Sequence, residues 1–336
     1  MRAWEINAPG VDALGLATRE TPEPGPGQVR VKMKANSINY RDLTTIEDPE
    51  GRKLPYPTVP NSDGAGVISA VGEGSPWSVG DRVASCFFED WTAGEISAAA
   101  MASALGGARQ GVLAEEVILP ADGVIATPAH LSDAEAATLP CAALTAWHAL
   151  TLPRPVMAGE TVLLLGTGGV SVFAQQFCAI MGARTIVTSS SDEKLARMKK
   201  LGANQTINYR DTPDWDAAVL EMTGGVGVDR VVEVGGPGTF DRSVNAVRVG
   251  GMVGLIGILT GIAGQASPTA IMRKSVTVRG IYVGSRAMFV DMNKAISAHG
   301  LKPVIDQTFG FEDAKAAYHT MRSAGHFGKL VIDFNK

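Results

Sequence analysis

The chain has 336 residues, of which 45% are hydrophobic, 19% charged and 6% aromatic, a composition that argues against a disordered or fibrous protein. Its length predicts two domains, each large enough to bury a hydrophobic core without disulfides or a structural metal. The 30 Lys and Arg residues and 34 Asp and Glu residues give a net charge of −4, and no basic run is present that would neutralise a row of phosphates. Nucleic acid is therefore not expected as the main partner.

The three cysteines, Cys86, Cys141 and Cys178, are too far apart in sequence to predict a disulfide framework or a C-x-x-C motif. The first ten residues carry charge and lack the apolar core of a signal peptide. Two long uncharged stretches, 161–183 and 249–272, are interrupted by Gly, Ser, Thr and Gln, which is typical of a buried core and not of a membrane span. We expect a cytoplasmic protein that is not inserted in a membrane.

The first 120 residues alternate short β-branched runs with turn residues, as in 28–34, 64–71 and 81–84, which predicts a β-rich half. The Pro- and Gly-rich segment 22–27 predicts the turn into the first clear strand. The Ala- and Gly-rich segment 93–107 has no function that composition reveals.

From about residue 160 to 285, apolar runs alternate with segments of helical periodicity, which predicts a parallel sheet covered by helices. The expected strands are 161–165, 184–189, 205–207, 228–234, 252–258 and 276–281, and the expected helices include 170–181, 192–201 and 240–247. Beyond this region we expect an extended segment at 302–309, a helix at 312–322 and a strand at 329–334, which rejoin the first half.

A glycine-rich turn follows the first of these strands and precedes a helix. Glycine lets a backbone turn tightly and approach a pyrophosphate, whose charge the helix N-terminus favours. The turn therefore predicts a dinucleotide site, the alternative being an ordinary strand-to-helix turn. Its candidate cofactor-binding residues are Gly166, Thr167, Gly168, Gly169 and Val170.

The next strand ends in hydroxyl-bearing residues instead of the Asp or Glu that holds the ribose of NAD. Ser189 and Ser190 offer donors to a 2′-phosphate and Lys194 adds positive charge, which favours NADP over NAD while leaving NAD possible. An equally good interpretation of this segment is that Ser191 or Asp192 is the N-cap of the following helix. Phosphate binding and helix capping are compatible. Three later strand ends carry glycine and are either cofactor contacts or plain turns: Val234 with Gly235, Gly257 with Ile258, and Tyr282 with Val283.

Seven short motifs in a fixed order carry a family resemblance: 25–31, 36–43, 63–67, 71–74, 79–83, 137–147 and 326–329. With them the chain resembles, over nearly its whole length, the zinc-independent, quinone-oxidoreductase-like branch of the medium-chain dehydrogenases/reductases. The resemblance implies an α/β protein with a GroES-like β domain (1–122 and 286–336) around a Rossmann domain with a doubly wound parallel sheet (123–285). It also implies an active site in the cleft between the two domains. A homodimer is a further expectation of the family, and strand 276–281 is our candidate for the edge strand through which two copies would associate.

The chain departs from the zinc-dependent members of that family. Asn39 stands where those members have their first cysteine ligand, and Asn61-Ser62-Asp63 replaces a Gly-His-Glu motif, so that only Cys141 matches a ligand position. One thiolate with an amide and a hydroxyl does not make a stable zinc site. The four-cysteine lobe is also missing, with 87–95 in its place, and we therefore predict no metal.

Without a metal, hydrogen-bond donors have to meet the oxyanion that forms when hydride reaches an acceptor. The candidate catalytic residues are Asn39, Tyr40 and Asp42. Asn39 would be a hydrogen-bond donor, and Tyr40 would donate a proton that water could also supply, its alternative being a packing or phosphate-contact residue. For Asp42 a structural cap or a cleft-closing group is favoured over a base, and pairing with Arg41 is the simplest interpretation of both. We expect all three candidates in a loop. The resemblance further implies cofactor contacts by Thr145, Tyr209, Phe327 and Lys329.

We therefore expect an enzyme that transfers hydride from NADPH to a small electron-poor acceptor, a quinone or an α,β-unsaturated carbonyl. The five histidines form no H-x-x-x-H pair and no G-x-S-x-G motif is present, which argues against metalloprotease and hydrolase functions. The alternatives are an alcohol dehydrogenase or aldehyde reductase of the same superfamily, and an NADPH-binding sensor without catalysis.

Overall fold

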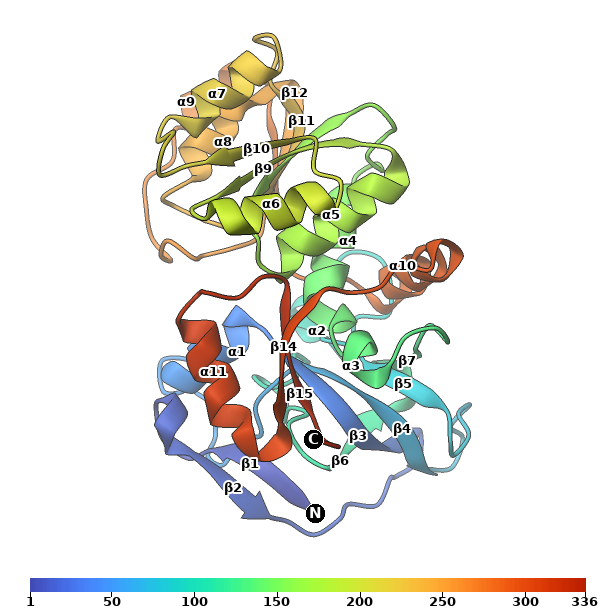
Figure 1. Cartoon of the computed structure of the whole chain (residues 1–336). Helices are drawn as coiled ribbons and strands as arrows, with labels where there is room; N and C mark the ends of the chain where they lie inside the picture. The colour runs from blue at the N-terminus through green and yellow to red at the C-terminus, as the bar shows by residue number, and fades with distance from the viewer. The chain divides into compact units, whose positions relative to one another are not determined.

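The computed structural model describes all residues from Met1 to Lys336, which form two units (Figure 1). The first unit contains Met1–Leu144 and Val283–Lys336, and the second contains Thr145–Tyr282. The family resemblance places the boundary between the two domains at residue 122. In the structure, the segment that follows residue 122 still packs on the first unit, which extends to Leu144. Strand β7 (Val124–Ala126) pairs with β5 (Arg82–Ser85), and further along the backbone N–H of Cys141 donates to Asp63.

A seven-stranded sheet forms the frame of the first unit. Its strand order is β14-β15-β3-β4-β5-β7, with β6 also paired to β3, and β15 runs antiparallel to β3 so that Leu330 lies opposite Ile38. Figure 1 shows the red C-terminal strands beside the blue β3. The strands are β3 (Gln28–Ile38), β4 (Asp63–Val71), β6 (Glu116–Pro120), β14 (Ile305–Gly310) and β15 (Lys329–Asp333); β1 (Arg2–Ile6) and β2 (Leu14–Thr18) form a separate pair. The helices are α1 (Tyr40–Glu47), α2 (Ala98–Met101), α3 (Asp133–Ala136), α10 (Arg286–His299) and α11 (Ala314–Arg322).

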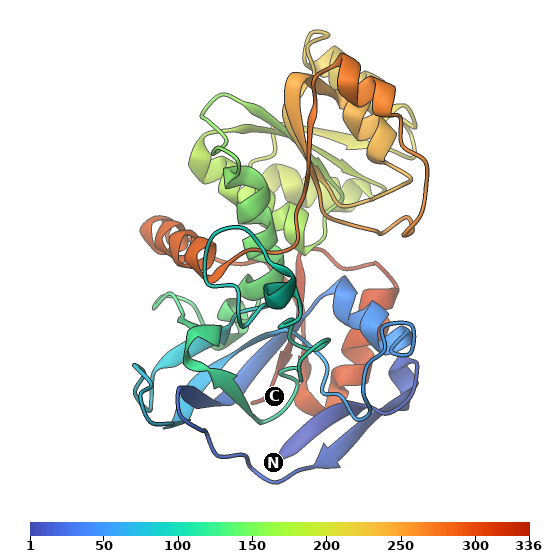
Figure 2. The ribbon, with the colours of Figure 1, turned by 180° about the vertical axis from the view of Figure 1, so that it is seen from behind.

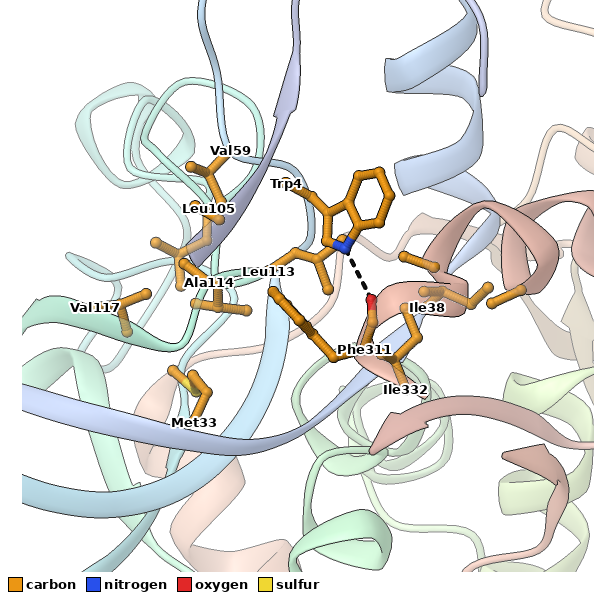
Figure 3. Packing of buried hydrophobic residues seen from close by; sticks show 14 of the residues in the cluster. Trp4, Met33, Ile38, Val59, Leu105, Leu113, Ala114, Val117, Phe311 and Ile332 are labelled. Atoms are coloured by element: carbon orange, nitrogen blue, oxygen red, sulfur yellow. Dashed lines mark hydrogen bonds between the residues drawn. The ribbon is translucent and has the colours of Figure 1, made fainter. Parts of the chain in front are cut away.

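The two ends of the chain share the core of the first unit. The indole Nε1 of Trp4 donates to the carbonyl oxygen of Phe311 at 2.8 Å, within a cluster that includes Ile38, Leu113 and Ile332 (Figure 3). Burying an aromatic ring and satisfying its N–H at the same point ties the N-terminal strand to the C-terminal segment. The predicted return of the C-terminus to the first half is thus confirmed.

The second unit is a six-stranded parallel sheet in the order β10-β9-β8-β11-β12-β13, flanked by helices. Figure 2 shows it from behind, with the orange segment of β12, α9 and β13 at one side. Its strands are β8 (Thr161–Leu165), β9 (Arg184–Ser189), β10 (Gln205–Asn208), β11 (Val228–Glu233), β12 (Val247–Leu255) and β13 (Thr277–Gly280). Its helices are α4 (Leu144–Thr151, except for its first residue), α5 (Gly169–Met181), α6 (Asp192–Lys200), α7 (Trp215–Met222), α8 (Phe240–Ala246) and α9 (Pro268–Arg273). The predicted α/β class with a parallel sheet is confirmed, and no helix combines the length and apolarity that crossing a bilayer requires.

The turns after β11 and β12 lie against each other at the carboxyl edge of this sheet. The backbone N–H of Thr260 donates to the carbonyl oxygen of Gly235 at 2.8 Å. A Cβ added at Gly257 would lie 1.8 Å from the carbonyl oxygen of Val234, so only glycine allows this approach.

We predict that Gly257→Ala lowers the free energy of unfolding by about 1–3 kcal/mol, because the added methyl group forces two backbones apart. Gly280→Ala is the matched control, since a Cβ there meets no atom within 4 Å and the backbone is not left-handed. Thermal unfolding of both variants checks this. Equal melting temperatures for the two variants would contradict the close approach of Gly257 to the backbone of Val234.

Candidate functional site

The glycine turn between β8 and α5 leaves its backbone open. Gly166 adopts φ +73°, and a Cβ added at Gly168 would meet no atom within 4 Å. The hydroxyl of Ser171 donates to the carbonyl oxygen of Leu165 at 2.6 Å, which fixes the start of the 13-residue helix against the strand. Open space beside Gly168 and a helix N-terminus together fit the pyrophosphate of a dinucleotide. Thr167 lies in this turn, and Gly169 and Val170 begin α5; their cofactor contacts stay predictions.

The ends of β9 and β10 bring the next group of predicted residues together. The backbone N–H of Tyr209 donates to the carbonyl oxygen of Ser189 at 3.0 Å. The hydroxyl of Ser191 accepts from the backbone N–H of Lys194 at 3.3 Å, so Ser191 is the N-cap of α6. Ser190 precedes it, half-buried, and the Tyr209 ring is exposed. Two serines at the end of β9 and a lysine in the first turn of α6 thus lie close together along the chain, and residues of these types suit a phosphate.

A buried carboxylate that sequence reasoning missed shapes the turn after β11. Glu233 Oε1 accepts from the backbone N–H groups of Gly235 and Gly236 at 2.7 and 3.0 Å and from the Thr239 hydroxyl at 2.6 Å, and Oε2 accepts from Ser243. These bonds hold Val234 and Gly235 beside Gly257 at the carboxyl edge of the sheet, and Ile258 follows there. The available signal was an acidic residue at the end of an apolar strand, directly before Gly-Gly.

In the first unit, Asn39 and Asp42 stand at the start of α1 and not in the loop that the sequence predicted. The carboxylate Oδ2 of Asp42 accepts from the backbone N–H of Asn39 at 2.9 Å, which caps the helix N-terminus. Oδ1 of Asp42 lies 3.2 Å from Arg41 Nη1, the pairing that the cap interpretation predicted. Tyr40, in the same turn, keeps 42% of its surface exposed. The cap explains why the chain is helical here.

Lys329 lies inside the first unit against this helix start. It is 4% exposed, and its Nζ donates to the carbonyl oxygen of Ile38 at 2.8 Å and to Oδ1 of Asn39. The amide Nδ2 of Asn39 is buried and makes no hydrogen bond. One end of the Asn39 amide is therefore held by a cation, and the buried nitrogen at the other end has no hydrogen-bond partner.

Asp63 completes this polar cluster. It is fully buried, Oδ2 accepts from the backbone N–H of Cys141 at 3.0 Å, and Oδ1 accepts from the Ser62 hydroxyl at 2.6 Å. Burial raises the pKa of Asp63 to about 6, although the Lys329 ammonium and the polar groups of Ser62 and Asn39 act in the opposite direction. The carboxyl group therefore changes charge near pH 6, about two pH units above an ordinary aspartate.

The four residues at the family's zinc-ligand positions do not fit a zinc ion. Asn39, Ser62, Asp63 and Cys141 provide one carboxylate and one thiol, and no group of three or more His, Cys, Asp or Glu residues suited to a metal exists in the chain. Burial raises the pKa of the Cys141 thiol well above its usual range, which disfavours the thiolate that binds metals. The Lys329 ammonium adds a positive charge to the same cluster.

The remaining candidates are placed as follows. Thr145 is buried in α4 and Phe327 is buried just before β15, while Tyr282 is exposed and Val283 adopts φ +56° after β13. These positions identify no ligand by themselves. Their cofactor roles stay predictions.

We predict that Gly168→Asp preserves folding but abolishes dinucleotide binding. Asp is a favoured N-cap and its Cβ meets open space, whereas its charge would face the phosphates of the cofactor. Gly168→Asn, equal in size but neutral, is the matched control. Calorimetric titration with NADPH should show that Asp raises the dissociation constant at least about tenfold and that Asn raises it less. If neither variant changes the dissociation constant, the cofactor phosphates do not bind at this turn.

A second prediction concerns the pH dependence of stability. The pKa of Asp63 is about 6 in the folded protein against an ordinary 3.8, so the folded state binds this proton more tightly. The free energy of unfolding therefore falls as pH rises from about 4 to about 6, by at most about 3 kcal/mol for this group. Asp63→Asn should flatten that part of the profile in urea unfolding. Glu89, whose pKa burial raises to about 7, titrates in both proteins as an internal control. Parallel profiles would contradict the raised pKa.

Comparisons with known proteins confirm the family resemblance. Residues 25–129 match the alcohol dehydrogenase GroES-like domain and residues 169–298 match the zinc-binding dehydrogenase domain. A zinc-type alcohol dehydrogenase-like protein of Schizosaccharomyces pombe is 44% identical, over 96% of each chain. A Sinorhizobium meliloti protein assigned as an alcohol dehydrogenase is 40% identical with a TM-score of 0.93, over 99% of this chain and 98% of that one. A 2-haloacrylate reductase of a Burkholderia species is 29% identical, over 92% of this chain and 91% of that one. The chain therefore belongs to the medium-chain dehydrogenase/reductase family of NAD(P)-dependent oxidoreductases.

Proposed function

We propose that this protein is an NADPH-dependent reductase that transfers hydride to a quinone or an α,β-unsaturated carbonyl compound without a metal ion. The observation that carries the proposal is the Asn39 amide, whose oxygen is held by Lys329 while its buried nitrogen has no hydrogen-bond partner. A donor of this kind suits an oxyanion. The similarity to a 2-haloacrylate reductase supports a conjugated acceptor.

The second unit provides the residues that would hold the cofactor. The backbone of residues 166–169 would bind the pyrophosphate, and Ser189, Ser190, Lys194 and Tyr209 would surround the 2′-phosphate that distinguishes NADP from NAD. When bound, the reduced nicotinamide supplies the hydride. Thr145, Phe327 and the strand ends at Gly257 and Tyr282 would supply further contacts.

The acceptor determines how much electrophilic assistance the protein has to provide. In an enone, the β-carbon gains the hydride, the C=C electron pair shifts toward the carbonyl, and the oxygen carries the negative charge of an enolate. A proton from water or from the exposed Tyr40 hydroxyl then gives the saturated carbonyl compound. Because conjugation spreads the charge, an amide donor is sufficient where a simple ketone needs a Lewis acid.

The test is oxidation of NADPH and NADH by the purified protein in a chelator, with a 1,4-quinone, an enone and a simple aldehyde as acceptors. We expect turnover of the first two with NADPH, and none with the Gly168→Asp variant as the matched blank. Activity that appears only after zinc is added would establish the alcohol dehydrogenase alternative. Intact NADPH binding without turnover of any acceptor would establish a sensor.

A further inference from the structure

Lys329 is an uncommon residue to find sealed inside a domain. A buried ammonium needs hydrogen-bond acceptors and a compensating negative charge, or its burial strongly destabilises the fold. Lys329 has two acceptors, the carbonyl oxygen of Ile38 and Oδ1 of Asn39. Burial lowers the pKa of Lys329, and the carboxyl groups of Asp63 and Asp42 act in the opposite direction by stabilising its charge. Its position is thus specified by the fold on every side.

The contact determines how the Asn39 amide is oriented. Lysine only donates hydrogen bonds, so the atom facing it has to be the amide oxygen, and Nδ2 takes the opposite position. The main chain of Asn39 is fixed as well, because its N–H is bonded to Asp42. Neither end of the residue is free to rotate.

The unused amide nitrogen then needs an explanation. Leaving a buried donor without a partner costs about 1–3 kcal/mol, and such atoms are rare in native structures unless a ligand uses them. Asp63 lies close enough for a side-chain interaction with Asn39 to lower its pKa, but Nδ2 meets no acceptor with hydrogen-bond geometry. An ammonium bonded to the amide oxygen also polarises the amide, which makes its N–H groups stronger donors.

We propose that Lys329 is a positioning residue for the reduction: its ammonium holds and polarises the Asn39 amide so that Nδ2 donates to the oxygen that becomes negative on the acceptor. The inference rests on the proposed function and explains how the Asn39 amide is positioned as a hydrogen-bond donor. Lys329 itself touches neither acceptor nor cofactor in this role.

A double-mutant cycle with Lys329→Met and Asn39→Ala tests the proposal. Each single variant should lower kcat about 10²-fold, the usual loss for one oxyanion donor, while the dissociation constant of NADPH stays unchanged. Because Lys329 acts through Asn39, the double variant should be no slower than Asn39→Ala alone. Lys274→Met is the matched control, since Lys274 likewise donates to two oxygen atoms, the backbone carbonyls of Val244 and Asn245, away from the site.

A second measurement reads the amide without requiring turnover. In protein labelled with ¹⁵N-asparagine, the Asn39 side-chain signal is identified by its loss in Asn39→Ala. Lys329→Met should shift it, Lys329→Gln should shift it less because a neutral donor remains, and Lys274→Met should leave it in place. If Lys329→Met does not fold, Lys329→Gln carries both measurements.

The outcomes separate the two proposals. Multiplied losses in the double variant, or weaker NADPH binding by Lys329→Met, would overturn the positioning role and make Lys329 a cofactor contact. An unmoved Asn39 signal would also overturn it. If the wild-type protein reduces none of the acceptors, the proposed function fails. The Asn39 side-chain signal then tests the positioning of Asn39 independently of turnover. A shift in Lys329→Met supports the positioning by Lys329, and an unshifted signal overturns it.

Discussion

The need to stabilise one ammonium group inside a protein domain organises the candidate site. Lys329 is the first residue of β15, and this strand pairs with β3 in a register that places Leu330 opposite Ile38, at the point where β3 ends and α1 begins. The lysine therefore meets the last carbonyl of one element and the cap residue of the next. Helix α1 can start with a buried asparagine because a cation from the other end of the chain satisfies its oxygen.

A second buried polar chain continues this arrangement. The hydroxyl of Tyr318, on helix α11, donates to Oδ1 of Asn61, whose Nδ2 donates to Oδ1 of Asn36 on β3 at 3.2 Å. Networks of this kind favour a single arrangement because each broken bond leaves a buried group unsatisfied. The C-terminal segment thus supplies both packing, through the Trp4 contact with Phe311, and the polar groups that fix the site.

Local sequence patterns predicted the parts of the structure that local physics determines. The glycine turn at 166–169 and the alternation of strands and helices follow from backbone freedom and hydrophobic periodicity, and both are found in the structure. The contact between Asn39 and Lys329 joins residues 290 positions apart, and no periodicity encodes it. The loop expected at the start of α1 came from the family resemblance, whereas the cap favoured for Asp42 on chemical grounds is what begins the helix. Glu233 was missed because its partners, two backbone N–H groups and the hydroxyls of Thr239 and Ser243, come together only when the turn after β11 folds.

An ammonium and a metal ion place different demands on the substrate. A metal coordinates the substrate oxygen directly and withdraws electron density from it, whereas in the proposed reduction the Lys329 charge would reach an acceptor only through the Asn39 amide. The assistance available is then that of one polarised hydrogen bond, which suits an oxygen whose negative charge is already shared by conjugation. Unlike a metal ion, the Lys329 ammonium is part of the protein chain and cannot dissociate, and its hydrogen bonds fix its position in the fold. Under the proposed function, the lysine therefore limits the enzyme to conjugated acceptors and makes its activity independent of metal supply.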